Sequence, residues 1–421
     1  YPGAKANFYV TQTSTRKSVY TDSGLVTPHS NPVIADANGV FPPIWLADDE
    51  AYRVTLTTSA DAVLTGYPVD GVGGGAASQL SIGQALFPVT DAENTAGVAP
   101  SNQEIPSSDA VGIVLAARYG FSPDASGATN YAAVVNAHAV AVAAGCAFST
   151  PSGAYSFAPS ATLVLTQNWF NVGMTRLNIN MTAFSGVVFQ QTGSTTIRGV
   201  FGNRTGTKQG TFLKQAPTDA GDFTGHQTLD HVWGFGFAKG IDIGNTYHNI
   251  YVKTRFNENT TGVYCVPSAA NGNGYVTTHI WVDPEFLDND QNVLYTSTLQ
   301  SRGVHFLNAS DEGSARITGS TFTRVRGLKF TNFYGEGTVG VKSLIVNDCT
   351  AEWDGQTYLN GTAGITLGTN TEAIIRGIAV GSATDVVTGG DGSQRVTIAD
   401  STLAASGNST SYASLVIINS T

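Results

Sequence analysis

The chain has 421 residues, of which only 12% are charged and 48 are glycine, and its formal net charge is −10. This composition is typical of turn-rich β protein and not of a coiled coil or a disordered chain. An acidic balance without a basic cluster argues against nucleic acid as a partner. No apolar run approaches the roughly 18 residues of a membrane helix, and no signal peptide is visible. The chain starts at Tyr1 rather than Met, as expected of a trimmed or partial product.

Residues 1–66 are predicted to form a small β module. Segments 7–10 and 52–56 alternate as strands, and a turn-rich stretch at 31–42 lies between them. Residues 67–125 are predicted to be a linker and neck. Within them, 72–78 is flexible by composition, and 87–100 leads on to Arg118-Tyr119-Gly120.

Residues 129–145 are predicted to be a helix. Thr129 or Asn130 is the expected N-cap, and Gly145 is the expected terminator. Its surface is apolar almost all round, which indicates a helix buried over the open first coil of a solenoid. His138 on this helix is expected to have a structural role.

A glycine followed by an alternating apolar strand recurs through the rest of the chain. Copies start at Gly186, Gly240, Gly262, Gly303, Gly327 and Gly364, and looser ones lie at 385–387 and 414–417. A second short strand precedes most copies. Self-similarity with a period of roughly 20–50 residues predicts an all-β parallel β-helix over 126–421, including the capping helix. The alternative, an all-β sandwich, does not predict that one sequence pattern recurs at a regular spacing.

Three segments resemble a known family. The pattern Asn-Pro-Val-x-x-Asp-x-x-Gly-x-Phe-Pro-x-Ile-Trp-Leu from Asn31 resembles the N-terminal module of many bacteriophage tailspikes. Segment 87–100 with Arg118-Tyr119-Gly120 is similar to their neck, and Gly153-Ala154-Tyr155 matches a turn that tailspike and pectate-lyase-like proteins place after the capping helix. Relatives usually continue the neck as Gly-x-Pro-Asp-Gly-x-x-Asp. Here 121–127 keeps Pro-Asp but loses the second acid.

The resemblance implies that the parallel β-helix is right-handed and that the protein is a homotrimeric tailspike or tail fibre of the phage virion. Its N-terminal module would attach to tail, baseplate or adaptor proteins, and its β-helix would bind a bacterial capsule or O-antigen polysaccharide, which many members cleave. It implies no membrane insertion. Tyr251, Phe256 and Trp281 are taken as outward apolar positions that a threefold interface could cover. Asp242, Tyr264, His305 and Lys329 align in the glycine phrases as a mixed surface stripe.

Glycoside hydrolysis requires two carboxyl groups about 5–5.5 Å or 6.5–9.5 Å apart. The intervals from 263 to 304 and from 328 to 365 are longer than one coil, and we expect loops there that carry a site. The predicted catalytic acids are Asp283, Glu285, Glu352 and Asp354. The predicted substrate-binding residues are Trp281, Asp288, Asp290 and Trp353, although Asp288-Asn289-Asp290 is also turn chemistry.

Two classes of function stay open: a polysaccharide depolymerase of the glycoside hydrolase type, and a non-enzymatic receptor-binding fibre on the same scaffold. A polysaccharide lyase is a third reading, but nothing selects its basic residue. No metal or cofactor is predicted, because no His pair has zinc spacing and Asp288-Asn289-Asp290 lacks the remaining ligands of a calcium loop. No Gly-x-Ser-x-Gly motif occurs.

Overall fold

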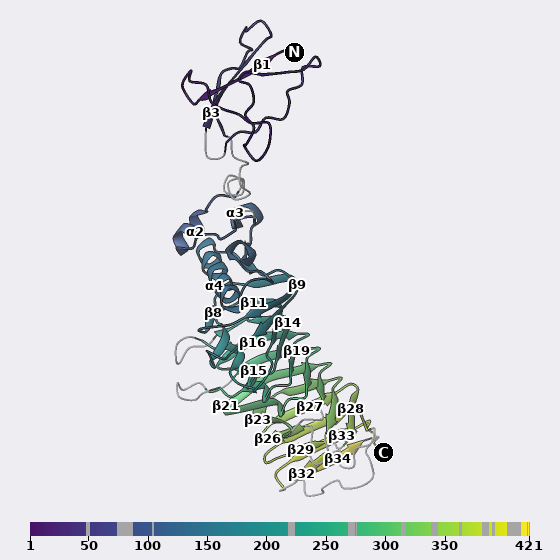
Figure 1. Cartoon of the computed structure of the whole chain (residues 1–421). Helices are drawn as coiled ribbons and strands as arrows, with labels where there is room; N and C mark the ends of the chain where they lie inside the picture. Colours follow the sequence, from purple (N-terminus) through teal and green to yellow (C-terminus); the bar gives the residue numbers. More distant parts are fainter. Residues whose placement is uncertain are drawn as a thin grey trace. The chain divides into compact units, whose positions relative to one another are not determined.

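A computed structural model describes residues 1–47, 51–73, 87–102, 105–217, 224–267, 274, 276–312, 317–337, 344–361, 364–380, 387–389, 392–401, 414–418 and 420. The chain divides into two compact units, Tyr1–Pro88 and Val89–Thr421 (Figure 1). Most of the predicted flexible linker and most of the glycine phrase at 385–387 lie outside the described residues. None of the described helices combines the length and apolar character needed to cross a bilayer.

The first unit is a four-stranded antiparallel sheet. Its strands lie in the order β2 (Val33–Ile34), β1 (Lys5–Val10), β3 (Ala51–Thr57) and β4 (Val69–Gly73). Phe8, Val19, Val33 and Tyr52 form its core. The predicted strands at 7–10 and 52–56 are therefore confirmed, and the unit has a hydrophobic core of its own.

The motif residues of the first unit hold its turns. The Asn31 side chain donates to the carbonyl oxygens of Phe8 (2.7 Å) and Lys17 (2.9 Å) and accepts from the Phe8 amide. Asp36 accepts from the amides of Asn38 and Val40 in the following turn. Gly39 has φ 79°, and a Cβ there would lie 2.8 Å from the Tyr1 nitrogen, so this turn requires glycine. The pattern that resembles tailspikes is thus also what this small sheet needs to fold.

The second unit begins with short helices around a buried ion pair. The helices are α2 (Asp91–Ala96), α3 (Ser108–Val111) and the 3₁₀ helix η1 (Ala116–Tyr119), and the short strand β5 (Val114–Leu115) directly precedes η1. Arg118 Nε lies 2.6 Å from Glu93, and the Tyr119 hydroxyl donates to the same carboxylate at 2.9 Å. Burial raises the pKa of Glu93, but hydrogen bonds from Arg118, the Thr90 amide and Tyr119 outweigh burial and hold the pKa below its usual value. Arg118 and Tyr119 of the Arg-Tyr-Gly motif therefore join η1 to α2 within the neck.

The predicted helix is α4 (Gly127–Ala144), which covers one end of the solenoid (Figure 1). Its N-cap is Ser126, whose hydroxyl accepts from the Thr129 amide at 3.1 Å, so the predicted cap at Thr129 or Asn130 was wrong. Gly145 ends the helix with φ 64°, as predicted. His138 is buried, and its Nε2 accepts from the Thr166 amide at 3.0 Å. Burial lowers the pKa of His138 to about 4, which fits the expected structural role of a neutral imidazole.

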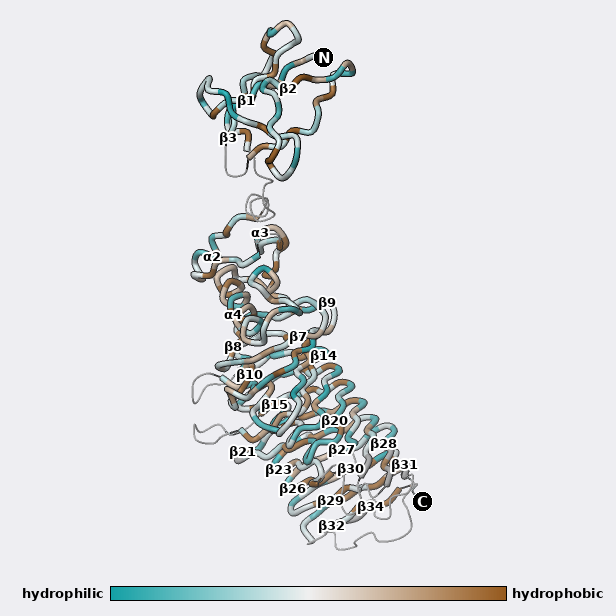
Figure 2. Tube along the Cα trace, viewed as in Figure 1, coloured by the Kyte–Doolittle hydropathy of each residue, from teal (hydrophilic) through white to brown (hydrophobic). Residues whose placement is uncertain are grey.

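The rest of the second unit is a parallel β-helix, in which each coil contributes strands to three successive ladders that we call faces 1, 2 and 3. In Figure 2, polar and apolar residues alternate along its strands. Face 1 consists of β8 (Leu163–Leu165), β10 (Val187–Gln191), β12 (Thr211–Gln215), β15 (Lys239–Ile243), β18 (Thr261–Cys265), the start of β21 (Gln291–Leu307), the start of β23 (Ser320–Arg326), β26 (Leu344–Asn347), β29 (Ile365–Leu367) and β32 (Val387–Gly389).

Face 2 follows face 1 in each coil. It consists of β5, β6 (Phe148–Ser149), the starts of β9 (Trp169–Ile179), β11 (Thr196–Asn203) and β14 (Thr228–Phe235), then β16 (Thr246–Val252), β19 (Thr277–Val282), the end of β21, β24 (Leu328–Thr331), β27 (Thr350–Asp354), β30 (Glu372–Arg376), β33 (Arg395–Ala399) and β34 (Ser414–Ile418). The short strand β13 (Thr224–Gly225) pairs with the beginning of β16.

Face 3 completes each coil. It consists of β7 (Gly153–Phe157), the ends of β9, β11 and β14, then β17 (Arg255–Asn257), β20 (Glu285–Leu287), β22 (Ser310–Glu312), β25 (Tyr334–Gly337), β28 (Thr357–Gly361) and β31 (Ile378–Val380). Neighbouring strands pair in parallel on all three faces, as the sequence predicted.

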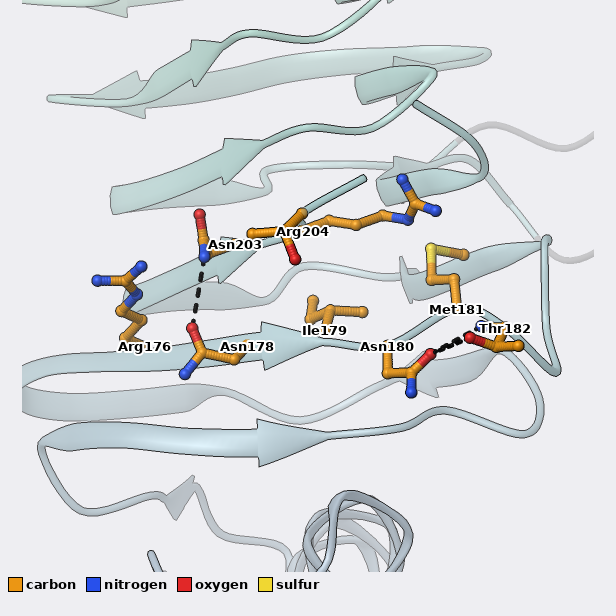
Figure 3. A pocket seen from close by; sticks show the side chains of 9 residues that line it. Arg176, Asn178, Ile179, Asn180, Met181, Thr182, Asn203 and Arg204 are labelled. Carbon is orange, nitrogen blue, oxygen red and sulfur yellow. Dashed lines mark hydrogen bonds between the residues drawn. The ribbon is translucent and has the colours of Figure 1, made fainter. Parts of the chain in front are cut away.

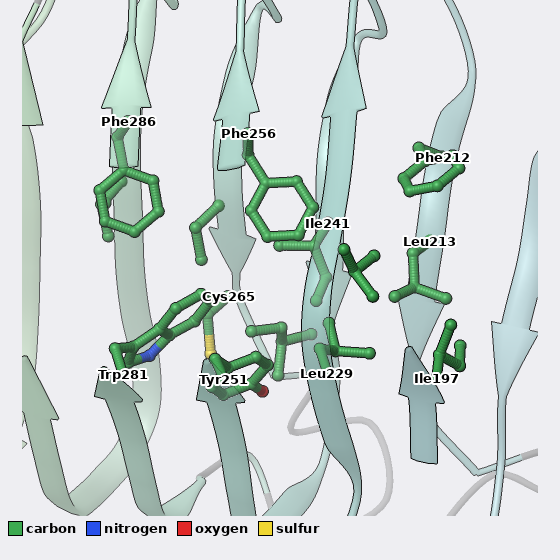
Figure 4. Close-up of a cluster of buried hydrophobic side chains, with 14 of the residues drawn as sticks. Ile197, Phe212, Leu213, Leu229, Ile241, Tyr251, Phe256, Cys265, Trp281 and Phe286 are labelled. Atoms are coloured by element: carbon green, nitrogen blue, oxygen red, sulfur yellow. The ribbon is translucent and has the colours of Figure 1, made fainter. Parts of the chain in front are cut away.

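A ladder of stacked aromatic rings fills the interior behind face 2. Tyr251 and Trp281 lie on adjacent coils with ring centres 3.7 Å apart and an interplanar angle of 9° (Figure 4). The stack continues from Trp281 through Phe306 and Phe330 to Trp353, at centre distances of 5.8, 5.4 and 5.2 Å. Both tryptophans are 0% exposed. The ladder therefore belongs to the core.

This packing corrects two expectations. Trp281 and Trp353 cannot present a ring to a saccharide, because both are enclosed by the solenoid. Tyr251 and Phe256 are also 0% exposed, so the residues chosen to cover a threefold interface are core residues. The physical reason is strand parity, because neighbouring residues point to opposite sides of a strand. On face 2 Trp281 points inward, and its predecessor Ile280 points outward.

The long intervals in the glycine repeat were also misread. Val263 lies on face 1, whereas Val304 lies on face 2, so the interval between them includes a change of face. The same applies to Leu328 on face 2 and Ile365 on face 1. These intervals are therefore not evidence of large inserted loops. From Ile280 onward the repeat on face 2 is nearly regular, as the successive register partners Ile280, His305, Lys329, Glu352 and Ile374 show. The preceding step on this face, from Ile250 to its partner Ile280, is longer.

Candidate functional site

The predicted pair Glu352 and Asp354 lies on face 2, on strand β27, around one lysine. Lys329 Nζ is 4.0 Å from an oxygen of Glu352 and 3.5 Å from an oxygen of Asp354, so both carboxylates contact the same ammonium group. Arg376 also contacts Glu352 at 2.6 Å. A depression of about 370 Å³ includes Lys329, Glu352 and Glu372 in its lining. The structure thus brings the two acids together, but each is already ion-paired.

Asp283 lies at the corner between faces 2 and 3. Its φ is 49°, and its carboxylate accepts from the Asn308 side-chain amide at 2.8 Å. Asn332 donates to Asn308 in turn, at 3.1 Å, and accepts from the Gln356 amide. Asp283 therefore begins a hydrogen-bonded ladder that joins the corners of successive coils, which is a structural role.

Asp288 and Asp290 flank the corner between faces 3 and 1. The residue between them, Asn289, is fully buried and donates to the Phe256 carbonyl at 2.7 Å and to Asn292 at 2.8 Å. Asp290 pairs with Lys208 at 2.9 Å. The Asp-Asn-Asp segment is thus built as a turn around its buried asparagine. Across the described residues, no group of three or more His, Cys, Asp or Glu is placed to hold a metal ion.

Glu285 lies on face 3, on strand β20. One of its oxygens is 3.2 Å from Arg255 Nε, and the other accepts from Asn257 Nδ2 at 2.9 Å. Asn257 also accepts from the Leu287 amide through its side-chain oxygen, so its orientation is set from both ends. Glu285 and the Glu352–Asp354 pair are on different faces and three coils apart, so they do not form one site.

Glu285 ends a stripe of outward side chains on face 3 that the sequence reasoning missed. Its members are register partners on five adjacent coils, and we call them the face 3 stripe: Arg176, Phe201, Trp233, Arg255 and Glu285. The guanidinium carbon of Arg176 lies 5.2 Å from the Phe201 ring centre, and that of Arg255 lies 4.6 Å from the Trp233 ring centre. The Phe201 and Trp233 rings meet edge to face at 5.6 Å. The stripe is a continuous set of contacts along the solenoid.

The local sequence explains why these aromatic rings point outward. Phe201 and Trp233 are each followed by a glycine, and a Cβ at Gly202 or Gly234 would lie 2.2 or 2.6 Å from the Phe212 ring inside the solenoid. Phe212 therefore takes the inward space that a side chain at either position would need. Trp233 is further fixed by a hydrogen bond from its Nε1 to the Lys253 carbonyl at 3.2 Å. The repeated phrase apolar, aromatic, glycine at 200–202 and 232–234 was the available signal.

A polar pocket of about 510 Å³ adjoins the start of the stripe (Figure 3). Its lining includes Arg176 and Asn178 from β9, Asn203 from β11, and Arg204 beyond the strand. Asn203 donates to Asn178 at 3.4 Å. The other lining residues are Ile179, Asn180, Met181, Thr182 and Thr205. Guanidinium, amide and hydroxyl groups beside half-buried aromatic rings can bind the hydroxyls and the C–H faces of sugars.

No protein-family model matches the sequence, and a search of curated proteins found no match. Among solved structures, the fold is similar to the enzymatically active domain of tailspike protein 2 of bacteriophage CBA120, with TM-score 0.52 and 12% identity, over 68% of this chain and 47% of that chain. Tailspike protein 4 of the same phage matches with TM-score 0.48 and 12% identity, over 68% and 44%. The A-module of a mannuronan C-5 epimerase of Azotobacter vinelandii matches with TM-score 0.44 and 12% identity, over 72% and 96%.

The match to tailspike protein 2 concerns the fold. This chain has the parallel β-helix of that phage tailspike domain, as the resemblance in its sequence implied. The chain spans about half the length of the two tailspike structures.

Proposed function

We propose that this chain is part of a phage tailspike and that it binds a bacterial surface polysaccharide, of the capsule or O-antigen, along face 3. The observation that carries this proposal is the face 3 stripe. It offers aromatic surface and guanidinium groups in one line over five coils, and a polar pocket adjoins it. An extended polymer can use such a line because each coil adds one binding group at the same register position.

The setting on the virion is part of the same proposal and rests on the resemblance to tailspikes. The unit Tyr1–Pro88 has its own sheet and core, which suits a separate attachment module for a tail, baseplate or adaptor protein. The β-helix would then act at the host cell surface, as one of three identical chains.

The experiment that tests binding uses the full chain and a panel of purified bacterial capsular and O-antigen polysaccharides. We expect binding to at least one of them, and weaker binding after Trp233→Ala. If no polysaccharide binds at micromolar protein concentrations, or if Trp233→Ala leaves binding unchanged, face 3 is not the receptor site.

A second candidate function is hydrolysis of the bound polymer, because Glu352 and Asp354 hold two carboxylates around one ammonium group beside a depression. Residues two apart on one strand are separated by about 7 Å. That spacing is compatible with the carboxyl separations of inverting glycoside hydrolases, about 6.5–9.5 Å. Glu285 is the alternative acid, on face 3. Hydrolysis would require the polymer to displace Lys329 from between the two carboxylates.

Hydrolysis is tested by following new reducing ends during incubation with a polysaccharide that binds. Loss of release in Glu352→Gln and Asp354→Asn, with release retained in Glu285→Gln, would place the chemistry on face 2. The reverse result would place it on face 3. Glu258→Gln, at an exposed corner, is the matched control. Binding by the unmodified chain without any release would make the protein a non-enzymatic receptor-binding fibre.

A further inference from the structure

The pocket beside the face 3 stripe has an unusual charge for this protein. The chain carries a formal net charge of −10, yet the described residues that line the pocket include two arginines and neither Asp nor Glu. Arg176 and Arg204 are the two cations. The pocket is therefore a local site of positive charge on an acidic chain.

Neighbouring described residues do not fully satisfy the charge and the hydrogen-bond donors of either arginine. The Arg176 guanidinium lies over the face of the Phe201 ring, which orients the group without neutralising its charge. Arg204 donates from Nη1 to the Gly236 carbonyl at 3.4 Å, while its Nε is buried and has no hydrogen-bond partner among the described residues.

The two guanidinium groups do not converge on one point. In Figure 3 they lie toward different ends of the pocket, with Asn178 and Asn203 near Arg176 and with Asn180 and Thr182 further along. A single small anion needs converging donors, whereas a chain of sugars that carries charged groups at intervals can meet separated arginines. The amides and hydroxyls between them can then bind sugar hydroxyls.

We propose that this pocket selects acidic polysaccharides and that Arg176 and Arg204 bind carboxylate groups of uronic-acid-type sugars. The planar guanidinium matches a carboxylate with two parallel hydrogen bonds, which an uncharged sugar cannot provide. This proposal rests on the proposed function as a glycan-binding protein and names the substrate class. It makes Arg176 the group shared by the pocket and the stripe.

The test compares each acidic polysaccharide of the panel with the same polymer after chemical reduction of its carboxylates to primary alcohols. This treatment keeps the sugar chain and removes only the charge. We expect the bound polymers to be acidic and their carboxyl-reduced forms to bind at least about tenfold more weakly. Arg176→Gln and Arg204→Gln should each weaken binding of the acidic form about tenfold to hundredfold, the range of one lost charge-assisted contact.

Arg395→Gln, an exposed arginine on β33 at the other end of the solenoid, is the matched control and should bind normally. Thermal unfolding of each variant shows whether the fold is intact, and Arg176→Lys tests whether the planar group rather than charge alone is needed. If only neutral polymers bind, or if carboxyl reduction leaves binding unchanged, the acidic preference is overturned while the proposed function stands. If no polymer of the panel binds, the proposed function itself is overturned, and this inference with it.

Discussion

The guanidinium of Arg255 lies over the indole of Trp233, 4.6 Å from the ring centre, and its Nε is 3.2 Å from Glu285 on the next coil. The indole is half-buried, so part of its surface remains open to a ligand. Arg255 thus holds an aromatic platform and an acid together on face 3, and this arrangement makes Trp233 the central residue of the proposed receptor site.

Trp233→Ala should weaken polysaccharide binding by roughly tenfold to thirtyfold. Removal of a central aromatic anchor typically costs about 2 kcal/mol of binding free energy, and about 1.4 kcal/mol corresponds to a factor of ten. The dissociation constant for the best polymer of the panel is the measurement. Trp45→Ala, which removes a tryptophan that is 46% exposed in the first unit, is the control and should bind normally. Equal loss in both variants would contradict the assignment.

Trp281→Ala should instead destabilise the solenoid by about 3–5 kcal/mol, the usual cost of replacing a buried Trp or Phe by Ala. Its ring stacks between Tyr251 and Phe306, and its Nε1 donates to the Tyr295 hydroxyl at 3.2 Å. Thermal or denaturant unfolding measures the effect. Trp233→Ala should shift stability far less, and the contrast between the two tryptophans tests the inward and outward assignment directly.

Glu93→Ala should cost about 3–5 kcal/mol of stability, because it leaves the Arg118 charge buried without its partner. Both side chains of this ion pair are 1% exposed. Asp242→Ala breaks the more exposed pair with Lys239 and should cost less than about 1 kcal/mol. Unfolding monitored by the loss of β structure compares the two variants. Similar costs would show that the Arg118–Glu93 pair is not a main stabilising contact of the neck.

Stability should fall as the pH is lowered from about 6.5 toward 4. Burial lowers the pKa of His138 to about 4 and that of His279 to about 3, whereas both have a pKa of about 6.5 when unfolded. Between these values the unfolded chain binds protons that the folded chain does not, so acid favours unfolding. The loss is about 2 kcal/mol for each histidine at pH 5. The fold therefore has its full stability, without this loss from the two histidines, only above a pH of about 6.5.

Denaturant unfolding at pH 8, 6.5 and 5 measures this dependence. His138→Gln keeps an acceptor for the Thr166 amide but cannot titrate, so it should reduce the slope between pH 6.5 and 5. His248→Gln, at an exposed position, should leave the slope unchanged. A flat profile for the unmodified chain would show that these histidines are not kept neutral in the fold.

The fold was predictable from the sequence because the repeat is strong, but the orientation of single side chains was not. Gly262 and Gly303 begin similar phrases on faces 1 and 2, so an alignment of phrases joined residues of different faces. Asp242 and Tyr264 are register partners as expected, whereas His305 and Lys329 belong to face 2. Trp281 and Ile280 are both apolar, and only the packing of neighbouring coils decides which of them faces inward.

Strand parity also limited what could be predicted of the candidate site. Glu352 and Asp354 lie on the same side of β27, as expected of residues two apart on one strand, and their catalytic role stays a prediction. Their cations, Lys329 and Arg376, come from the coils on either side and depend on an exact register. Arg176, Phe201 and Trp233 come from three successive coils and are far apart in the sequence, so nothing local shows that their side chains touch.

The register that aligns the face 3 stripe also bears on how such a protein can diverge. Each coil lengthens the stripe by one strand spacing, about 4.8 Å, and repeats the interior contacts of its neighbours. Gain or loss of a whole coil would therefore change the length of the proposed glycan site while leaving the core continuous. A shift of one residue within a strand would exchange the inward-facing and outward-facing side chains, and the Trp233 side chain would then point into the core. The proposed receptor site can thus lengthen or shorten in steps of a coil.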